Sequence, residues 1–182
     1  MQVDPHVQVA AMNTQSELPT GPSKAEMMQA VRELLDFIGG RPLGPELEAA
    51  LNERYGAHTE GYARLLALLR RGMDEGWSCY AEIDGPDYRR GRIAHASPDT
   101  DGFTVESGCL RNVPGHYHRH PLGEINMIGP VDETGRFCGA GAGWKVFPPD
   151  SSHFPTVTGG RVTMLFFLPG GQIEYRNPPS AP

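Results

Sequence analysis

The chain contains the stretch Gly115-His116-Tyr117-His118-Arg119-His120-Pro121-Leu122-Gly123-Glu124, in which three of its 7 histidines occupy every second position. Side chains alternate between the two faces of a β-strand, so a strand here would direct His116, His118 and His120 to the same side. Imidazole binds zinc, iron, nickel, copper and manganese, and the carboxylate of Glu124 adds an oxygen donor. The stretch therefore predicts a metal site built on a β-sheet.

A second histidine segment, Pro148-Pro149-Asp150-Ser151-Ser152-His153, lies further along the chain. Its prolines mark a turn, after which a second strand would bring His153 beside the first cluster. Alternating histidines also occur on solvated strand faces. We favour metal binding because several potential donors fall in two short segments that both have the character of strands.

The region around both segments, from residue 77 onward, is rich in glycine, proline and β-branched or aromatic residues. Turn sequences such as Asp84-Gly85-Pro86 and Pro169-Gly170-Gly171 separate short extended runs, and one run, Val162, Met164, Phe166 and Leu168, alternates as an inward wall. We expect strands at residues 79–83, 89–94, 103–110, 115–120, 124–128, 143–147, 153–157, 161–168 and 172–176. This pattern predicts a mainly β fold, an antiparallel β-barrel or jelly roll over residues 77–182.

Residues 23–76 have helical spacing instead. Apolar residues recur at the helical period from 23 to 38, from 45 to 55 and from 59 to 75, and a glycine follows each run. Ser23 and Glu26 form a capping-box signature at the first start. We expect this N-terminal helical segment to cover one side of the β domain or to supply a dimer surface, and residues 1–22, which are polar, to form a mobile tail.

Composition narrows the class of protein. The net charge of -6, without a run of lysine or arginine, disfavours a nucleic-acid surface and an anionic membrane as partners. We expect a cytoplasmic protein, because no leader or membrane-spanning apolar run is evident. We also expect it to bind a small molecule and to form a homodimer or higher homo-oligomer. Cys79, Cys109 and Cys138 are odd in number and widely spaced, which argues against a disulfide framework, and Cys138 is the candidate reactive thiol.

With the strands placed, His118-Arg119-His120 followed by Glu124 resembles the first cupin motif, and residues 148–153 resemble the second. This resemblance implies a cupin-like barrel in which one divalent metal ion (iron, manganese, zinc or nickel) is bound by His118, His120, Glu124 and His153.

The chain departs from the cupin motifs at four positions. Asp150 and Asn112 stand where the motifs have glycine, Val157 stands where the second motif usually has asparagine, and His116 is additional. These departures leave open whether Glu124 or His116 completes the set of ligands.

A closer resemblance covers nearly the whole chain, which is similar to the bacterial 4-hydroxylaminobenzoate lyase family, small cupin-like proteins of nitroaromatic degradation. The resemblance is carried by the N-terminal helical segment, by residues 114–124 and by Gly143-Trp144-Lys145-Val146-Phe147-Pro148-Pro149. It implies conversion of 4-hydroxylaminobenzoate to 3,4-dihydroxybenzoate (protocatechuate) with release of ammonia.

A benzoate substrate requires a cationic partner, and the planar fork of arginine matches a carboxylate best. We expect Arg111 or Arg161 to bind the small aromatic substrate, with Trp144 stacking on its ring, and His116 and Tyr117 to move protons. Arg119 ranks last among the arginines because it should point away from flanking histidines that face the cavity.

Two other classes of function stay open. One is a cupin enzyme of different chemistry, such as a dioxygenase or isomerase acting on a small aromatic or sugar acid, and the other is a non-catalytic, metal-dependent binding module. No glycine-rich phosphate loop opens a helix, so we expect no nicotinamide or flavin cofactor.

Overall fold

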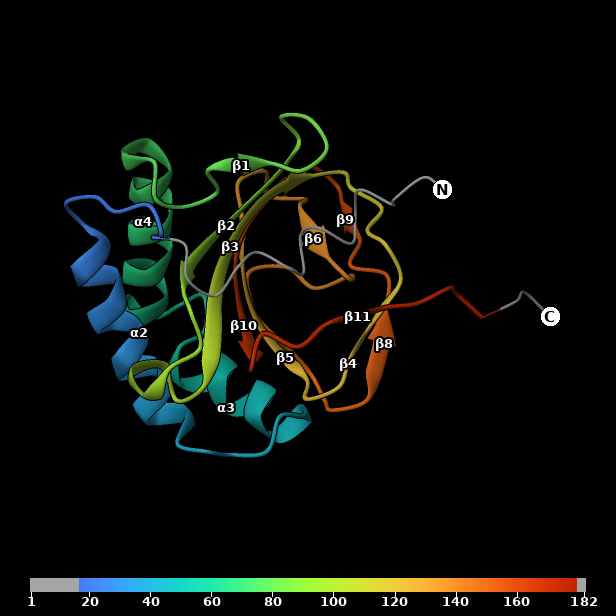
Figure 1. Ribbon diagram of the computed structural model, residues 1–182, viewed down its shortest axis with the longest axis horizontal. Coiled ribbons are helices and arrows are strands. Elements are labelled where there is room, and N and C mark those ends of the chain that lie inside the picture. Colours follow the sequence, from blue (N-terminus) through green and yellow to red (C-terminus); the bar gives the residue numbers. More distant parts are fainter. Residues whose placement is uncertain (1–16, 180–182) are drawn as a thin grey trace.

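The computed structural model describes residues 17–179, and the first sixteen residues of the predicted tail lie outside the described residues. Within the described residues three helices precede the strands, as the periodicity predicts (Figure 1). Their bounds are Lys24–Ile38 (α2), Pro45–Arg54 (α3) and Glu60–Glu75 (α4). No helix within residues 17–179 combines the length and apolarity needed to cross a bilayer.

The predicted capping box at the start of α2 does not form, although the helix begins where expected. Ser23 makes no side-chain cap hydrogen bond to its own helix. Its hydroxyl and its backbone N–H instead donate to the Glu75 carboxylate at the end of α4, at 2.7 and 2.9 Å. A tertiary contact with a nearby carboxylate has replaced the local one, and it ties the start of α2 to the end of α4.

From residue 81 to residue 175, strands joined by loops form three antiparallel sheets. The strands are Ala81–Glu82 (β1), Tyr88–Ala94 (β2), Phe103–Arg111 (β3), His118–His120 (β4), Glu124–Pro130 (β5), Arg136–Phe137 (β6), Gly143–Phe147 (β7), Ser151–His153 (β8), Val157–Thr158 (β9), Arg161–Pro169 (β10) and Glu174–Tyr175 (β11), with a short 3-10 turn at Pro98–Thr100 (η1). The largest sheet has the order β1-β2-β3-β10-β5-β7, and two smaller sheets have the orders β11-β4-β8 and β6-β9. The predicted mainly β, antiparallel fold is confirmed.

The six-stranded sheet is buried on both faces at β10, which separates two hydrophobic cores. On one face Leu165 and Phe167 pack with the apolar sides of α2, α3 and α4. On the other face Val162, Met164 and Phe166 pack inside the barrel, as predicted from their alternation. The helices therefore cover the outer face of the sheet (Figure 1).

Four strand predictions need correction. Residues 79–83, 115–120 and 172–176 contain strands of only 2, 3 and 2 residues, and residues 153–157 hold the end of β8 and the start of β9. In addition, β6 was not predicted. Residues 113–117 have no regular structure, so the prediction that His116 shares a strand with His118 and His120 is wrong.

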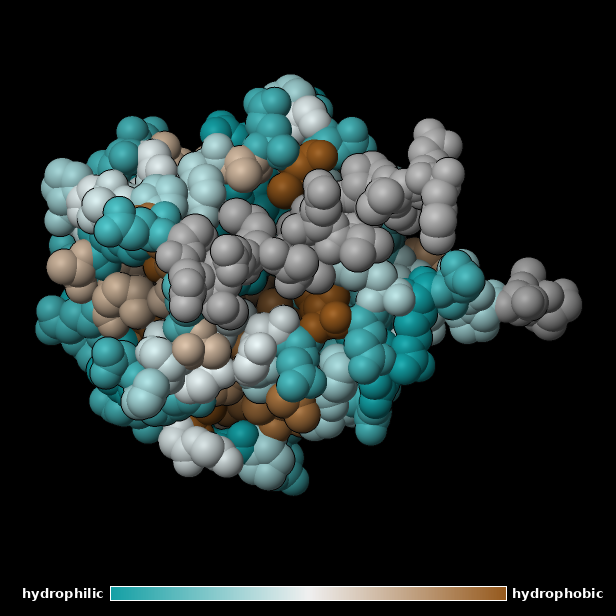
Figure 2. Space-filling view, viewed as in Figure 1, coloured by the Kyte–Doolittle hydropathy of each residue, from teal (hydrophilic) through white to brown (hydrophobic). Residues whose placement is uncertain are grey.

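The face of the molecule shown in Figure 2 is mainly hydrophilic, with hydrophobic residues in separate patches. Among residues 17–179 the exposed large hydrophobic residues are Leu122, Val131, Phe154 and Tyr175. A homo-oligomer stays a prediction.

Candidate metal centre and adjoining pocket

The three histidines of the two motifs come together on the small sheet. β4 and β8 pair antiparallel with His118 directly opposite His153, and His120 follows two residues later on the same face. Their Nε2 atoms lie 2.9 Å apart for His118 and His120 and 3.0 Å apart for the other two pairs. Three nitrogens this close lie within reach of one cation at the roughly 2.0–2.1 Å typical of imidazole ligation.

The hydrogen bonds of the Nδ1 atoms indicate the tautomers of His118 and His153. His118 Nδ1–H donates to the His116 carbonyl at 2.9 Å, which leaves a lone pair on Nε2. The Cys138 thiol donates to the Phe154 carbonyl, so its sulfur accepts from His153 Nδ1–H at 3.6 Å. Two lone pairs therefore face each other across 3.0 Å. Such an arrangement is repulsive unless a cation lies between them, so the site fits a metal ion.

Burial keeps the three imidazoles neutral. Removal from water lowers the pKa of His118 to about 4 and the pKa values of His120 and His153 to about 3. At neutral pH each imidazole therefore lacks the second ring proton, whose positive charge would repel a cation.

Glu124 lies beside this cluster at the start of β5. Its Oε1 is 3.7 Å from His120 Nε2, and burial raises its pKa to about 7. Gly123 before it has φ +87, and a Cβ there would lie 2.6 Å from the Phe147 carbonyl oxygen, so the turn requires glycine. This turn returns the chain from β4 to β5 within a few residues and sets Glu124 near the histidines.

Two departures from the cupin motifs preserve the backbone that glycine would give. Asp150 has φ +66 and Asn112 has φ +48, both in the left-handed region. Aspartate and asparagine adopt this region more readily than other non-glycine residues. The third departure, Val157, is buried in the barrel core.

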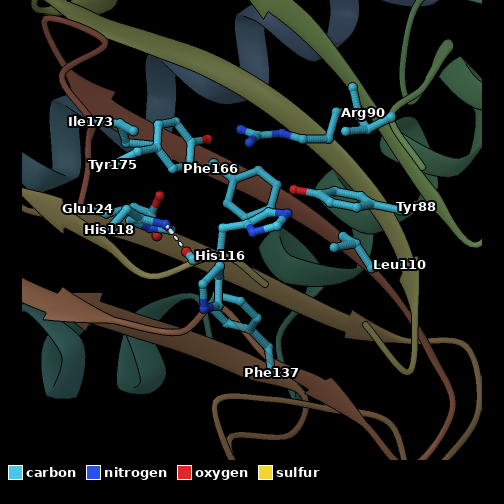
Figure 3. Close-up of a pocket in the computed structure, with 12 residues that line it drawn as sticks. Tyr88, Arg90, Leu110, His116, His118, Glu124, Phe137, Phe166, Ile173 and Tyr175 are labelled. Carbon is cyan, nitrogen blue, oxygen red and sulfur yellow. Dashed lines mark hydrogen bonds between the residues drawn. The ribbon is translucent and has the colours of Figure 1, made fainter. Parts of the chain in front are cut away.

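A pocket adjoins the cluster inside the barrel (Figure 3). Its cavity volume is about 40 Å³, and the pocket is partly open to solvent. The polar residues that line it are Tyr88, Arg90, His116, His118, Glu124 and Tyr175, and the apolar ones are Ile83, Leu110, Phe137, Pro155, Phe166 and Ile173. The apolar residues can pack against an aromatic ring, and the polar residues can form hydrogen bonds with its substituents.

The structure places the other predicted site residues outside this pocket, except His116. Arg111 is exposed, and Arg161 donates to Asp87 at 2.8 Å. Trp144 is buried in the core between the sheet and the helices, where its Nε1–H donates to a backbone carbonyl. Tyr117 packs against the ring of Phe154, with 4.9 Å between centroids.

Arg90 lines the pocket in place of the predicted arginines, and sequence reasoning missed it together with Tyr88 and Tyr175. The signal was present, since Tyr88 and Arg90 are two positions apart on a strand and so share a face. The adjacent Arg89 has the same chemistry, and the sequence does not show which of the two faces the barrel interior.

The family model for PnbB, 4-hydroxylaminobenzoate lyase, matches residues 29–175. The chain belongs to the 4-hydroxylaminobenzoate lyase family. The match includes part of the helical segment and all the strands, so the predicted resemblance is confirmed, and the chain is an enzyme of this lyase family.

Two relatives carry the name 4-hydroxylaminobenzoate lyase. The chain is 36% identical to one from Nocardioides sp. (strain LMS-CY) over 163 residues, which cover 86% of this chain and 96% of that protein. It is 34% identical to one from Pseudomonas putida over 165 residues, which cover 82% of this chain and 94% of that protein. Among solved structures, an RmlC-like cupin protein from Ralstonia eutropha JMP134 is 14% identical, with a TM-score of 0.42 over 56% of this chain and 66% of that one.

Proposed function

We propose that this member of the 4-hydroxylaminobenzoate lyase family is a metal-dependent enzyme that converts 4-hydroxylaminobenzoate and water to 3,4-dihydroxybenzoate and ammonia. The observation that carries the proposal is the convergence of three neutral imidazole nitrogens beside a pocket with aromatic and aliphatic walls. Family membership supports the substrate, and the histidine cluster supports the need for a metal ion.

The proposed ligands are His118, His120 and His153, with Glu124 as the fourth. Imidazole with one carboxylate suits iron, manganese, zinc or nickel. A bound cation would supply Lewis acidity toward the hydroxylamine oxygen and would lower the pKa of a bound water molecule.

The reaction balances without an external oxidant or reductant. The N–O bond breaks and its oxygen leaves as water, which reduces the nitrogen by two electrons. Oxygen from water adds to ring carbon three, which is oxidised by two electrons, and carbon four is left as an imine. A second water hydrolyses this imine and releases ammonia. Loss of the proton on carbon three then restores the aromatic ring, so the net reaction consumes one water.

Residues of the pocket perform the remaining tasks in this proposal. The apolar walls around Phe137 and Phe166 hold the ring and limit access of bulk water. His116 is exposed and also lines the pocket, so its imidazole is placed to exchange protons between the substrate and solvent. Tyr117, predicted to share this task, lies against Phe154 and receives no role here.

An anaerobic assay tests the proposal. Purified protein loaded with each candidate metal in turn is incubated with 4-hydroxylaminobenzoate, and ammonia and 3,4-dihydroxybenzoate are measured. We expect equal amounts of both, loss of activity after treatment with a chelator, and recovery after metal is restored. If fully metallated protein forms neither product but consumes dioxygen with another aromatic acid, the dioxygenase alternative replaces the lyase.

A further inference from the structure

Arg90 supplies a positive charge to the pocket at the side formed by β2 and β11. Tyr88 and Arg90 project from β2, and Tyr175 comes from β11. In Figure 3 the Tyr175 hydroxyl is directed toward the Arg90 guanidinium, and the Tyr88 hydroxyl is directed into the pocket. The guanidinium carbon also lies 5.0 Å from the centre of the Phe166 ring, which forms part of the apolar wall. One planar cation with two hydroxyl groups thus borders an aromatic pocket.

The charge of Arg90 is only partly compensated by neighbouring acids. Glu106 accepts from Arg90 Nη2 at 2.5 Å and from Arg92 Nη2 at 2.9 Å, so one carboxylate serves two guanidinium groups. Arg90 Nε is buried and has no hydrogen-bond partner among residues 17–179. Glu124 also faces the pocket, but its Oε1 is directed to His120 at 3.7 Å. Glu106 therefore balances only one of the two guanidinium charges.

Two partly buried guanidinium groups that share one carboxylate are unfavourable, and an anionic ligand would offset the cost. Tyr88 and Tyr175 also line the pocket, and each phenolic hydroxyl can donate to such a ligand. A carboxylate matches this set of donors, because the arginine fork accepts two oxygens and each hydroxyl adds one donor.

We propose that Arg90, with the hydroxyls of Tyr88 and Tyr175, binds the carboxylate of the substrate. The inference rests on the proposed function and deepens it. A rigid ring with its carboxylate at Arg90 extends its opposite end toward the histidine cluster, so the pocket selects arylhydroxylamines with the carboxylate para to the nitrogen. Arg90 is then a specificity-determining residue, in the role that the sequence assigned to Arg111 or Arg161.

A comparison of two substrates tests this role. The specificity constant kcat/KM is measured for 4-hydroxylaminobenzoate and for phenylhydroxylamine, which lacks the carboxylate, in the wild type, in Arg90→Gln and in Arg176→Gln. Arg176 is an exposed arginine next to Tyr175 and does not line the pocket. We expect Arg90→Gln to lower kcat/KM for the acid about 100-fold, as for loss of charge-assisted hydrogen bonds, and to leave phenylhydroxylamine nearly unchanged. Arg176→Gln should keep the wild-type preference.

Equilibrium binding of benzoate, measured by calorimetry, separates this inference from the proposed reaction. We expect the wild type to bind benzoate, Arg90→Lys to bind it several-fold more weakly because an ammonium lacks the fork, and Arg90→Gln to show no binding. Arg90→Lys keeps the charge beside Glu106, so it protects the test against a variant that fails to fold.

The outcomes distinguish the two proposals. Arg90-dependent benzoate binding without turnover of 4-hydroxylaminobenzoate would sink the lyase function and leave the carboxylate site standing. Turnover with an unchanged preference for the acid in Arg90→Gln would overturn the carboxylate site alone. An equal loss for both substrates would also overturn it, since that is the result of a structural role. Absence of benzoate binding to the wild type has the same consequence.

Discussion

His118 is oriented by the backbone carbonyl of residue 116. The side chain of residue 116 is not needed for this role. The His116 carbonyl oxygen accepts from His118 Nδ1–H and so directs the Nε2 lone pair toward the other histidines. Any residue at position 116 supplies that carbonyl. The His116 side chain itself lies outside the cluster formed by His118, His120 and His153.

We therefore expect His116→Ala to retain the full metal content of the wild type. The measurement is the metal-to-protein ratio of protein purified without chelator, by elemental analysis. Activity should fall if the imidazole exchanges protons, and added small imidazoles should restore part of it. A folded variant that has lost its metal would show instead that His116 is a ligand.

Alanine at His118, His120 or His153 should have the opposite effect on metal content. Each change removes one of three converging nitrogens, and a site with two imidazoles binds more weakly. We expect bound metal to fall at least about 10-fold while far-ultraviolet circular dichroism keeps its native shape. His58→Ala, a change in an exposed loop, is the control and should retain its metal. Full occupancy in His153→Ala would mean that the second motif is not part of the site.

At the scale of single residues, the sequence predicted the histidines better than the arginine. Histidines two apart in a short strand carry their own geometric information, because both must point to one side. Position 116 lost this regularity because the strand starts only at His118. The choice between Arg89 and Arg90 depends on which face of β2 is turned inward, and tertiary packing decides that.

At the level of elements, Glu75 connects the ends of two helices. Its Oε2 accepts from the backbone N–H and hydroxyl of Ser23 and from Trp77 Nε1, and its Oε1 accepts from Arg71. The hydrogen bonds from Ser23 lower the pKa of Glu75 from 4.5 to about 2. The ionised carboxylate thus satisfies donors at the N-terminus of α2, where a negative charge is favourable.

Glu75→Gln should lower the midpoint of urea unfolding at pH 7. A carboxyl group with a depressed folded-state pKa stabilises the fold above its unfolded value, near 4.5, and this contribution is lost as pH falls toward 2. The difference in midpoint between variant and wild type should therefore shrink as pH falls from 5 to 3. A difference that stays constant over this interval would contradict the assigned role of the charge.

The helices and long strands were predicted from the sequence, whereas the short strands were not. Helical periodicity and closing glycines located α2, α3 and α4 to within a few residues, and alternation located β10. β6, with only 2 residues, shows too little alternation to be recognised. The capping box failed because a carboxylate distant in sequence competes for Ser23, which local patterns cannot show.

At the scale of the whole molecule, the stability of the fold depends on the six-stranded sheet, because both hydrophobic cores pack against it. Phe167 is fully buried on the helical side of β10, and Phe166 on the other side forms part of the pocket wall. We expect Phe167→Ala to lower the free energy of unfolding by about 3–5 kcal/mol, the range for a large aromatic side chain removed from a core. Urea unfolding followed by circular dichroism measures this change.

Phe154→Ala provides the comparison for this stability prediction. Phe154 is 49% exposed, and its removal should change the free energy of unfolding by no more than about 0.5 kcal/mol. A similar cost for both variants would mean that the core between sheet and helices contributes less than its burial indicates.

The pairing of His118 with His153 across β4 and β8 affects when the histidine cluster forms during folding. His120 and His153 are 33 residues apart in the chain, with β5, β6 and β7 between them in sequence, so their nitrogens meet only when this long loop closes. Closing so long a loop is slow compared with forming α2 or α4. If the proposed metal is bound there, it is acquired late in folding, by a barrel whose main sheet already exists. The rate at which a newly made chain matures would then depend on the supply of metal in the cell, and the amides of β4 and β8 would be the last to gain protection from exchange.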